Sequence, residues 1–278
     1  MLKDSLVQVL SQEELARVYS AFDVIGDIVI IKVPDGLATR KKLIAEAILK
    51  NTKQARTVFA QTSAVKGEYR VRDLEFLAGE HKTLTEYKEH GCRFKVDVAS
   101  TYFSPRLSTE RLRIANLVQG NEQIVNMFGG VGTFSVLIAR KNETATVYSI
   151  DYNPQAAELC ELNAKLNKVR DRVISICGEA SSAIREQLAG HCHRVIMPLP
   201  ERAHEYVDSA ILALKDQGMV HYFAHIKSDN KKQAEKEAMR DVERAFRNYS
   251  HAIILVRTVR EVGPRIYQMV SDVHVRKN

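Results

Sequence analysis

From residue 106 onward the chain alternates between short apolar segments and amphipathic segments, and this rhythm is what most restricts its fold. Five apolar segments predict strands, at 123–130, 145–153, 172–180, 194–200 and 219–226. Strands that alternate with helices form a parallel sheet covered on both faces, because each crossover lays a helix over the sheet. Such doubly wound sheets bind their ligands at the carboxyl ends of the strands.

The rest of the chain predicts a C-terminal strand pair, one further helix and a separate N-terminal domain. The segments 251–262 and 265–275 predict two strands that are close enough in sequence to form an antiparallel hairpin at one edge of the sheet. The segment 201–218 predicts one helix that ends at Gly218. Residues 1–95 mix an amphipathic segment with strand-like ones. We therefore expect a small α+β domain over 1–95, followed by an α/β domain over 96–278.

Charge and hydropathy narrow the possible partners and the cellular location. The net charge is +7 and the isoelectric point is near 9.2, which permits a polyanionic partner such as a nucleic acid. No apolar run is long enough to cross a membrane, and the N-terminal segment lacks a secretory signal's apolar region. We expect a cytoplasmic protein that does not contact a membrane.

The four cysteines give no sign of a metal site. Their spacing contains no C-x-x-C pair and fits no zinc motif, so free buried thiols are expected. The run His191-Cys192-His193 enters the strand 194–200, and alternate side chains on a strand point apart, which disfavours a shared metal ion. We expect no metal.

The sequence IVNMFGGVGTFSV places a glycine cluster between a strand and a helix. Gly129, Gly130 and Gly132 allow a tight turn and close backbone approach to a ligand. The next strand ends at Asp151, about twenty residues further on, where a carboxylate can accept hydrogen bonds from both hydroxyl groups of a ribose. Together these features predict a site for a cofactor that contains a nucleoside.

The glycine spacing favours S-adenosylmethionine over a nicotinamide dinucleotide. The dinucleotide pattern is G-x-G-x-x-G, whereas here the order is G-G-x-G, preceded by Phe128. The third strand ends in Gly178-Glu179-Ala180, where an acidic side chain could meet the amino group of an adenine. An alternative role for Glu179 is that of a helix N-cap or first-turn acid.

Several motifs resemble those of the archaeal and eukaryotic tRNA (guanine-37-N1)-methyltransferases. These motifs are YFSPRLSTER (102–111) followed by MFGGVGTFS, then GEYRVRDLEFLAGE (67–80), IMPLPERAHEYVD (196–208) and VREVGPRIYQMVSD (259–272). The resemblance covers nearly the whole chain from about residue 15. It implies a Rossmann-like class I methyltransferase sheet preceded by the smaller α+β domain. Fuller family members carry an additional N-terminal domain, which we expect this chain to lack.

The resemblance also implies roles for individual residues. The general base for guanine N1–H would be Glu110, and Arg70 would stabilise negative charge on guanine O6. Arg106, Pro198 and Pro200 would contact the substrate. The residues implied to line the S-adenosylmethionine site are Tyr102, Arg111, Phe128, Gly129, Gly130, Val131, Gly132, Asp151, Tyr152, Glu179, Ala180 and Pro198.

Other interpretations of these residues remain open at this stage. Glu110 and Arg111 could form an ordinary ion pair on a helix surface, and Arg70 could belong to a solvated strand face. Arg257, with Arg260 and Arg265 near it, is a candidate for phosphate contact. The charged helix expected over 231–247 also carries acidic residues and is interpreted as a solvated face.

Pro198 is the main departure from the family pattern, which is usually written I-M-N-L-P. A proline has no side-chain amide to hold an amine of the target base, but it keeps a carbonyl group and a fixed turn. The resemblance is therefore to an archaeal branch with Pro-Leu-Pro, some of whose members methylate 4-demethylwyosine at the same tRNA position. This departure bears on which base is the substrate and leaves the reaction class unchanged.

These observations lead to one functional prediction and three alternatives. We predict a monomeric methyltransferase that acts at position 37 in the anticodon loop of tRNA, on N1 of guanosine or C7 of 4-demethylwyosine in tRNA-Phe. The alternatives are an aminocarboxypropyl transferase of wyosine biosynthesis, a non-catalytic tRNA-binding protein and a nicotinamide-dependent oxidoreductase. The RLST and LP features disfavour the aminocarboxypropyl transferase. The retained site residues disfavour the non-catalytic tRNA-binding protein, and the glycine spacing disfavours the oxidoreductase.

Overall fold

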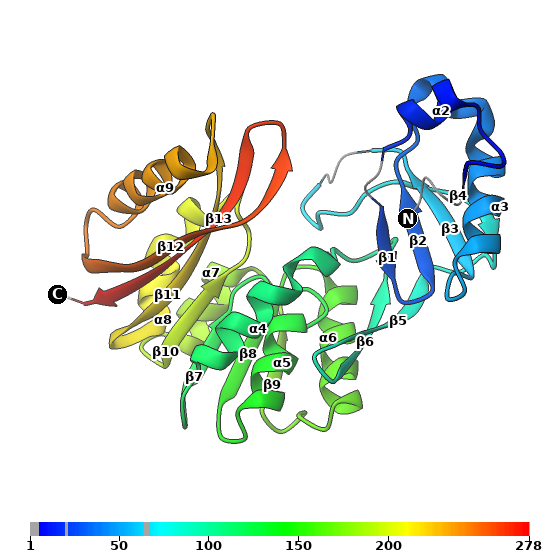
Figure 1. The fold of residues 1–278 in the computed structure, drawn as a ribbon. Coiled ribbons are helices and arrows are strands. Elements are labelled where there is room, and N and C mark those ends of the chain that lie inside the picture. Colours follow the sequence, from blue (N-terminus) through cyan, green and yellow to red (C-terminus); the bar gives the residue numbers. More distant parts are fainter. Residues whose placement is uncertain (1–5, 20–21, 64–66, 278) are drawn as a thin grey trace. The chain divides into compact units, whose positions relative to one another are not determined.

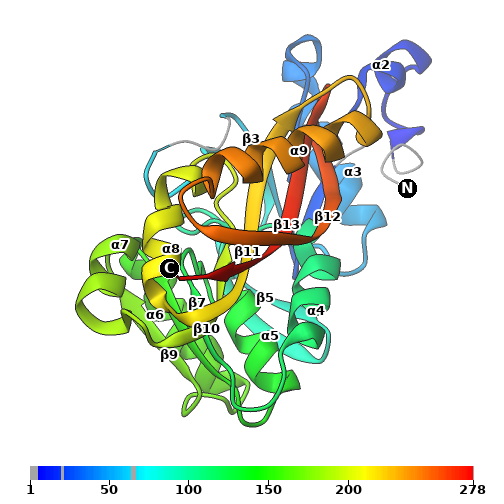
Figure 2. The same cartoon turned by 90° about the vertical axis from the view of Figure 1, so that its left-hand side faces the viewer.

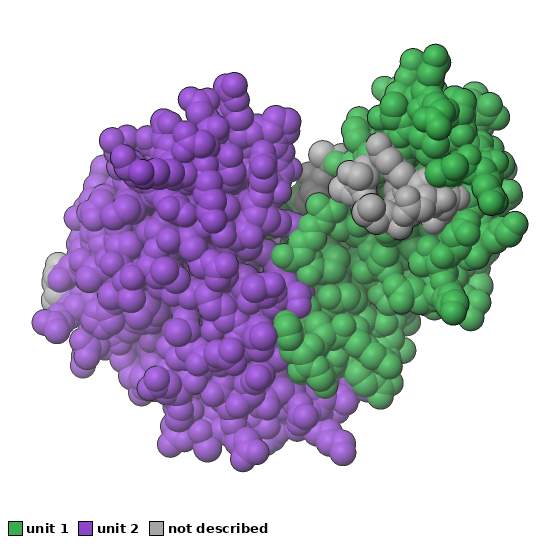
Figure 3. Space-filling view, viewed as in Figure 1, with its two compact units in different colours: residues 1–106 green, residues 107–278 purple. Residues whose placement is uncertain are grey.

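The chain divides into two compact units, residues 1–106 and 107–278 (Figure 3). The structure, a computed structural model, describes residues 6–19, 22–63 and 67–277. Figure 1 labels the helices and strands. Each unit has its own sheet and its own buried core, so each is described separately.

Unit 1 is an α+β unit built on a four-stranded sheet in the order β1-β2-β3-β4. Strands β2 and β3 are parallel, and the outer pairs are antiparallel. Ile44 and Ile48 of α3 pack against the sheet residues Val29 and Val58. A separate antiparallel hairpin, β5-β6, turns at His90-Gly91. The elements are α2 (Gln12–Arg17), β1 (Asp23–Ile25), β2 (Ile28–Ile31), η1 (Asp35–Arg40), α3 (Lys41–Asn51), β3 (Thr57–Gln61), β4 (Leu74–Gly79), β5 (Leu84–Glu89) and β6 (Cys92–Asp97).

Unit 2 contains a seven-stranded sheet in the order β12-β13-β11-β10-β7-β8-β9. The strands from β11 to β9 are parallel, and β13 and β12 add an antiparallel hairpin at one edge, as predicted. The strands are β7 (Gln123–Asn126), β8 (Thr146–Asp151), β9 (Val173–Cys177), β10 (Cys192–Met197), β11 (Leu214–Lys227), β12 (Ser250–Gly263) and β13 (Ile266–Arg276). This sheet confirms the Rossmann-like α/β fold class.

Helices cover both faces of this sheet. Neighbouring side chains on a strand point to opposite faces, and on β11 Tyr222 packs against Phe246, whereas Phe223 packs against Phe134 of α5. Phe246 directly follows α9, so α5 and the end of α9 lie on opposite faces. The helices are η2 (Pro105–Leu107), α4 (Ser108–Leu117), α5 (Thr133–Lys141), α6 (Pro154–Leu166), α7 (Ala180–Ala183), η3 (Ile184–Leu188), η4 (Ala203–Tyr206), α8 (Val207–Ala213) and α9 (Lys231–Ala245).

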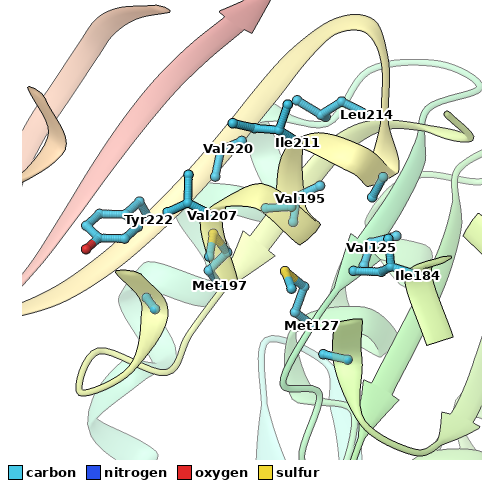
Figure 4. Packing of buried hydrophobic residues seen from close by; sticks show 14 of the residues in the cluster. Val125, Met127, Ile184, Val195, Met197, Val207, Ile211, Leu214, Val220 and Tyr222 are labelled. Carbon is cyan, nitrogen blue, oxygen red and sulfur yellow. The ribbon is translucent and has the colours of Figure 1, made fainter. Parts of the chain in front are cut away.

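The main core of unit 2 lies between the central strands and the helices α7, η3, α8 and α9. Figure 4 shows Val207 and Ile211 of α8 beside Val195 of β10 and Val220 of β11. Helix α9 lies across the β12-β13 hairpin (Figure 2), where the buried Ala234 and Ala238 form part of the apolar stripe predicted from the sequence.

The prediction of one helix over 201–218 is wrong. The structure has the short helix η4, then α8, which ends at Ala213, and Leu214 begins the long strand β11. Gly218 does not close a helix; it lies within β11, where an added Cβ would sit 2.5 Å from the carbonyl oxygen of His193. The glycine therefore allows β11 to approach β10 closely.

Candidate active site

The switch point of the sheet lies between β7 and β10. From β7 the strand order runs outward to β8 and β9 on one side and to β10 and β11 on the other. In doubly wound sheets ligands bind outside the carboxyl ends of the strands at such a point. The backbone N–H of Met127 donates to the carbonyl oxygen of Ile196 at 3.0 Å, so Phe128 and Pro198 follow directly from adjacent strand ends.

The glycine loop 127–132 turns the chain from β7 into α5. Gly132 has φ of +84°, and a Cβ there would lie 2.6 Å from Sγ of Cys160. At Gly129 a Cβ would lie 2.2 Å from Oγ of Ser149. The buried Asn163 donates from its side chain to the carbonyl oxygen of Val131 at 2.9 Å. The loop is thus pressed against β8 and α6 in a form that only glycines permit.

Asp151, at the end of β8, is joined directly to this loop. Its Oδ2 accepts a hydrogen bond from the backbone N–H of Gly130 at 2.6 Å, and its Oδ1 accepts from Asn153 N–H at 2.9 Å. The carboxylate is partly exposed, and the neighbouring Tyr152 is exposed. A carboxylate held beside a glycine loop is the arrangement that nucleoside-binding sites use for a ribose.

Glu179 acts as the N-cap of α7. Its carboxylate accepts hydrogen bonds from the backbone N–H groups of Ser181 at 3.0 Å and Ser182 at 2.8 Å. Burial opposes ionisation of Glu179, but these backbone hydrogen bonds outweigh it and lower the pKa. The alternative that the sequence left open, an N-cap role, is therefore the one seen here. Ala180 begins α7 and is buried.

The prolines lie where β10 ends. The strand stops at Met197, and Pro198 follows it, half-buried. Pro200 is buried, and its carbonyl oxygen accepts from the backbone N–H of His225 at 3.4 Å. On the neighbouring strand end, Phe128 packs edge-to-face on Tyr206 with the ring centres 5.0 Å apart. At the switch point, the Phe128–Tyr206 pair thus lies at the end of β7, and the turn with the two prolines lies at the end of β10.

Glu110 lies in the first turn of α4 and is 2% exposed. Its Oε1 accepts a hydrogen bond from Nε of Arg113 at 2.7 Å, and the ion pair brings Nη2 of Arg113 to 2.6 Å from the same oxygen. Its Oε2 lies 3.3 Å from Nη1 of Arg257 but has no hydrogen-bond partner among the described residues. Arg111 is also 2% exposed. The surface ion pair that the sequence allowed for Glu110 and Arg111 is excluded by this burial.

The residues that hold Glu110 in place were not among those predicted from the sequence. Arg113 also donates to both carboxylate oxygens of Asp272, from Nη1 at 2.6 Å and from Nη2 at 2.9 Å. His221 contacts the same carboxylate, with Nδ1 2.6 Å from Oδ1. The spacing of three residues between Glu110 and Arg113 on a helix was the available signal. No local pattern connects Asp272 of β13 with His221 of β11.

Three predicted site residues belong to unit 1. The guanidinium of Arg70 lies 4.6 Å from the ring centre of Tyr102, and both residues line a small pocket that Arg72 also lines. Arg70 has φ of +53°. Arg106 is more exposed and forms a 2.8 Å ion pair with Asp23, which also lies 3.5 Å from Arg72. The structure thus brings Arg70 and Tyr102 together, with Arg106 connected to Arg72 through one carboxylate.

The basic residues of the C-terminal hairpin are already engaged within unit 2. Arg257 lies next to Glu110, Arg260 donates to Oε1 of Gln268 at 2.7 Å, and Arg265 pairs with Asp229 at 3.1 Å. Of these, Arg265 has the most exposed side chain, at 71%. On α9, intrahelical ion pairs such as Arg240–Glu237 fit the solvated face that the sequence predicted.

Among the residues that the structure describes, no group of three or more His, Cys, Asp or Glu side chains could hold a metal ion. Within the same residues, no helix is both long enough and apolar enough to cross a membrane. The prediction of buried free cysteines is confirmed for Cys92, Cys160 and Cys192. It is wrong for Cys177, which ends the edge strand β9 and is exposed.

Comparison with known proteins gives consistent matches along the chain. The family model described as "TRM5/TYW2 methyltransferase domain" matches residues 85–254, and the one described as "TYW2 N-terminal domain" matches residues 2–83. The tRNA (guanine(37)-N(1))-methyltransferase Trm5b of Pyrococcus abyssi is 38% identical over 264 residues, covering 95% of this chain and 77% of that protein.

Two further relatives are named for other activities. The tRNA 4-demethylwyosine(37)-methyltransferase Taw21 of Saccharolobus solfataricus is 34% identical and covers 92% of this chain and 94% of its own length. The tRNA(Phe) (4-demethylwyosine(37)-C(7)) aminocarboxypropyltransferase of Methanocaldococcus jannaschii is also 34% identical, over 89% of this chain and 95% of its own length.

Solved structures match in the same way. A complex of aTrm5 with tRNALeu superposes with a TM-score of 0.85 and 35% identity, over 99% of this chain and 78% of the other. The structure of M. jannaschii TYW2 in complex with AdoMet superposes with a TM-score of 0.69 and 26% identity, over 93% of this chain and all of the other.

Proposed function

The chain belongs to the TRM5/TYW2 methyltransferase family, and we propose that it transfers a methyl group from S-adenosylmethionine to N1 of guanosine 37 in tRNA. The observation that carries this proposal is the position of Glu110. It is a buried carboxylate with Oε1 fixed by Arg113, while Oε2 has no hydrogen-bond partner among the described residues. A general base needs this combination of a fixed orientation and an acceptor oxygen that no donor occupies. Oε2 is buried 3.3 Å from Arg257, so the target base reaches it only when the side chains that cover it move aside.

The residues at the switch point fit S-adenosylmethionine. A Cβ at Gly129 or Gly132 would clash with Ser149 or Cys160, so the glycines let the loop pack tightly beside Asp151. Asp151 supplies a carboxylate for the ribose hydroxyl groups. When bound, the cofactor supplies an electrophilic methyl group. We propose that it is lined by the residues predicted from the sequence: Tyr102, Arg111, Phe128, Gly129, Gly130, Val131, Gly132, Asp151, Tyr152, Glu179, Ala180 and Pro198.

The proposed transfer needs one proton acceptor and one positive charge. The N1–H proton of guanine passes to Oε2 of Glu110, and the electron pair of N1 forms the new bond to the methyl carbon, while the pair of the broken C–S bond stays on sulfur. Arg70 stabilises the negative charge that develops on O6. In this proposal residues 1–95 form the domain that carries Arg70, and residues 96–278 form the methyltransferase domain. Arg106, Pro198 and Pro200 contact the target base or the nucleotides next to it.

We also propose which nucleotide is methylated, the oligomeric state of the protein and its location in the cell. The target is position 37 of the anticodon loop, and the protein acts as a monomer in the cytoplasm. The Pro198-Leu199-Pro200 motif resembles that of one archaeal branch, and this resemblance supports C7 of 4-demethylwyosine as a second acceptor at the same position. The relative named as a 4-demethylwyosine methyltransferase, 34% identical over 92% of this chain, supports this second acceptor.

The test uses S-adenosylmethionine labelled either in the methyl carbon or in the aminocarboxypropyl carbons. Two tRNA substrates are compared, one with guanosine and one with 4-demethylwyosine at position 37, and a tRNA with adenosine at position 37 is the matched control. Methyl label in 1-methylguanosine is the expected result. Methyl label in the tricyclic base alone would restrict the function to the second acceptor. Aminocarboxypropyl label, or no transfer to either substrate, would overturn the proposal.

A further inference from the structure

A chain of buried polar side chains runs from Glu110 into the sheet of unit 2. Arg113 lies between Glu110 and Asp272 and donates to both carboxylates. Asp272 is 4% exposed and His221 is fully buried. Burial of a charged group costs free energy unless the group is paired. Several paired charges within one core therefore suggest that they serve the function of the protein.

The hydrogen atoms on His221 are fixed by its neighbours. Arg194 lies 2.8 Å from Nε2 of His221, and since a guanidinium can only donate, Nε2 must be the acceptor. Nδ1 therefore carries the proton and donates to Asp272 at 2.6 Å. Glu122 holds Arg194 from the far side with two hydrogen bonds, of 2.7 and 3.0 Å.

The burial of His221 and the positive charges beside it also favour its neutral form. Burial lowers its pKa, and the positive charges of Arg194 and Arg113 add to this effect, although Asp272 opposes it. Burial alone would raise the pKa of Asp272, but the hydrogen bonds from His221 and Arg113 outweigh burial and hold the pKa well below its ordinary value. Asp272 is thus a carboxylate whose two oxygens are both occupied.

We propose that Asp272 is a positioning residue for methyl transfer, acting through Arg113 on Glu110. This inference rests on the proposed function. The two hydrogen bonds that Arg113 donates to Asp272 fix the guanidinium plane of Arg113, which in turn fixes Oε1 of Glu110. Oε2, which is buried 3.3 Å from Arg257 and has no hydrogen-bond partner among the described residues, then receives the proton of the acceptor base. Asp272 also balances much of the positive charge of Arg113 beside Glu110.

The groups that act on Glu110 come from several elements. Arg113 lies on its own helix, and Arg257 of β12 approaches Oε2. Asp272 of β13 and His221 of β11 lie behind Arg113. Removal of the negative charge at position 272 leaves Arg113 and Arg257 unopposed beside Glu110, which weakens Glu110 as a base.

The decisive variant is Asp272→Asn. The amide oxygen of the asparagine can still accept from Nδ1 of His221, but its NH2 group faces the donors of Arg113. We expect the single-turnover rate of methyl transfer to guanosine 37 to fall about tenfold or more. The acid limb of the pH–rate profile should move to lower pH, whereas S-adenosylmethionine affinity, measured by calorimetry, should change less than about threefold.

Two further variants separate positioning from folding. Asp241→Asn is the matched control, because Asp241 also pairs with an arginine and accepts from a buried tyrosine of β11 but lies outside the chain of residues that reaches Glu110. It should keep the wild-type rate. His221→Gln should keep most of the activity, since a side-chain amide can accept from Arg194 and donate to Asp272.

Arg113→Lys covers the case in which Asp272→Asn does not fold, because lysine keeps the charge but lacks the planar fork that binds both oxygens of Asp272 while it contacts Glu110. It should also slow transfer about tenfold or more. A wild-type rate and pH profile in whichever of these variants is folded would overturn the inference. An absence of transfer by the wild-type protein would instead overturn the proposed function, so the two failures are distinguishable.

Discussion

The backbone N–H of Gly130 donates a 2.6 Å hydrogen bond to Oδ2 of Asp151. This bond joins the loop after β7 to the end of β8, so the carboxylate predicted to bind a ribose also fixes the glycine loop. A backbone group and a charged side chain form one of the stronger kinds of hydrogen bond in proteins. Loop shape and cofactor recognition should therefore be lost together.

Asp151→Asn should weaken S-adenosylmethionine binding about tenfold to a hundredfold. A hydrogen bond to a charged group is worth about 1.5–3 kcal/mol, and each 1.4 kcal/mol corresponds to a factor of ten in the dissociation constant. Isothermal titration calorimetry measures the change. Asp171→Asn is the control, because the side chain of Asp171 is 77% exposed and lies away from the loop. Wild-type affinity in Asp151→Asn would remove Asp151 from the cofactor site.

Glu110→Gln should abolish most methyl transfer while leaving the cofactor bound. The glutamine keeps the shape of the side chain but cannot take the proton, and general base catalysis contributes about a hundredfold to ten-thousandfold. Single-turnover transfer to guanosine 37 measures the rate, and calorimetry measures cofactor affinity. Glu158→Gln, an exposed acid on α6, serves as the control. An unchanged rate in Glu110→Gln would refute the role of general base.

The fold and the cofactor loop could be predicted because their signals are local. The alternation of strands and helices, the glycine loop and Asp151 are readable within windows of a few residues. The helix over 201–218 was mispredicted because the apolar spacing from Val207 to Leu214 fits a helix. The pairing of β11 with β10 and β13, which only the folded chain provides, converts Leu214 and the residues after it into a strand.

Beyond the spacing of Glu110 and Arg113 on α4, the support of Glu110 could not be predicted from the sequence, because Asp272 and His221 lie on strands far along the chain. Arg113 precedes Asp272 by 159 residues, and His221 precedes Asp272 by 51. Each of these residues alone is an ordinary polar position. They become one feature only when β11 and β13 pair and His221 stands opposite Asp272 in the register.

Gly132→Ala should destabilise the protein by about 2–5 kcal/mol. The left-handed backbone costs a residue with a Cβ about 1–2 kcal/mol, and the contact with Cys160, at 2.6 Å, adds an overpacking cost of about 1–3 kcal/mol. Urea unfolding measures the loss. Gly120→Ala is the control, since Gly120 has φ of +50° but no atom within 4 Å of an added Cβ. An equal loss of unfolding free energy in both variants would show that contact of the added Cβ with Cys160 of α6 costs no stability.

The free energy of unfolding should decrease as the pH falls below about 6.5. Burial lowers the pKa of His221, so the folded protein keeps this side chain neutral while the unfolded chain, with a pKa near 6.5, binds a proton. Stability from this residue is complete above pH 6.5 and should fall by about 1 kcal/mol between pH 6.5 and 5.5. Urea titrations at both pH values, compared with those of His221→Gln, isolate this contribution from that of other histidines. A wild-type protein whose pH dependence matched that of the variant would contradict a neutral His221.

Pro198→Asn should raise the preference for guanosine over 4-demethylwyosine. Pro198 directly follows the last residue of β10 at the switch point and has no side-chain hydrogen-bonding group. An asparagine adds an amide that can bind the amino group of guanine, worth about 0.5–1.5 kcal/mol, or about twofold to tenfold in the ratio of the two kcat/KM values. Pro198→Ala is the matched control, because it removes the ring without adding an amide. An equal shift in both variants would assign the effect to the rigid turn, and an unchanged ratio in both would show that Pro198 does not select the base.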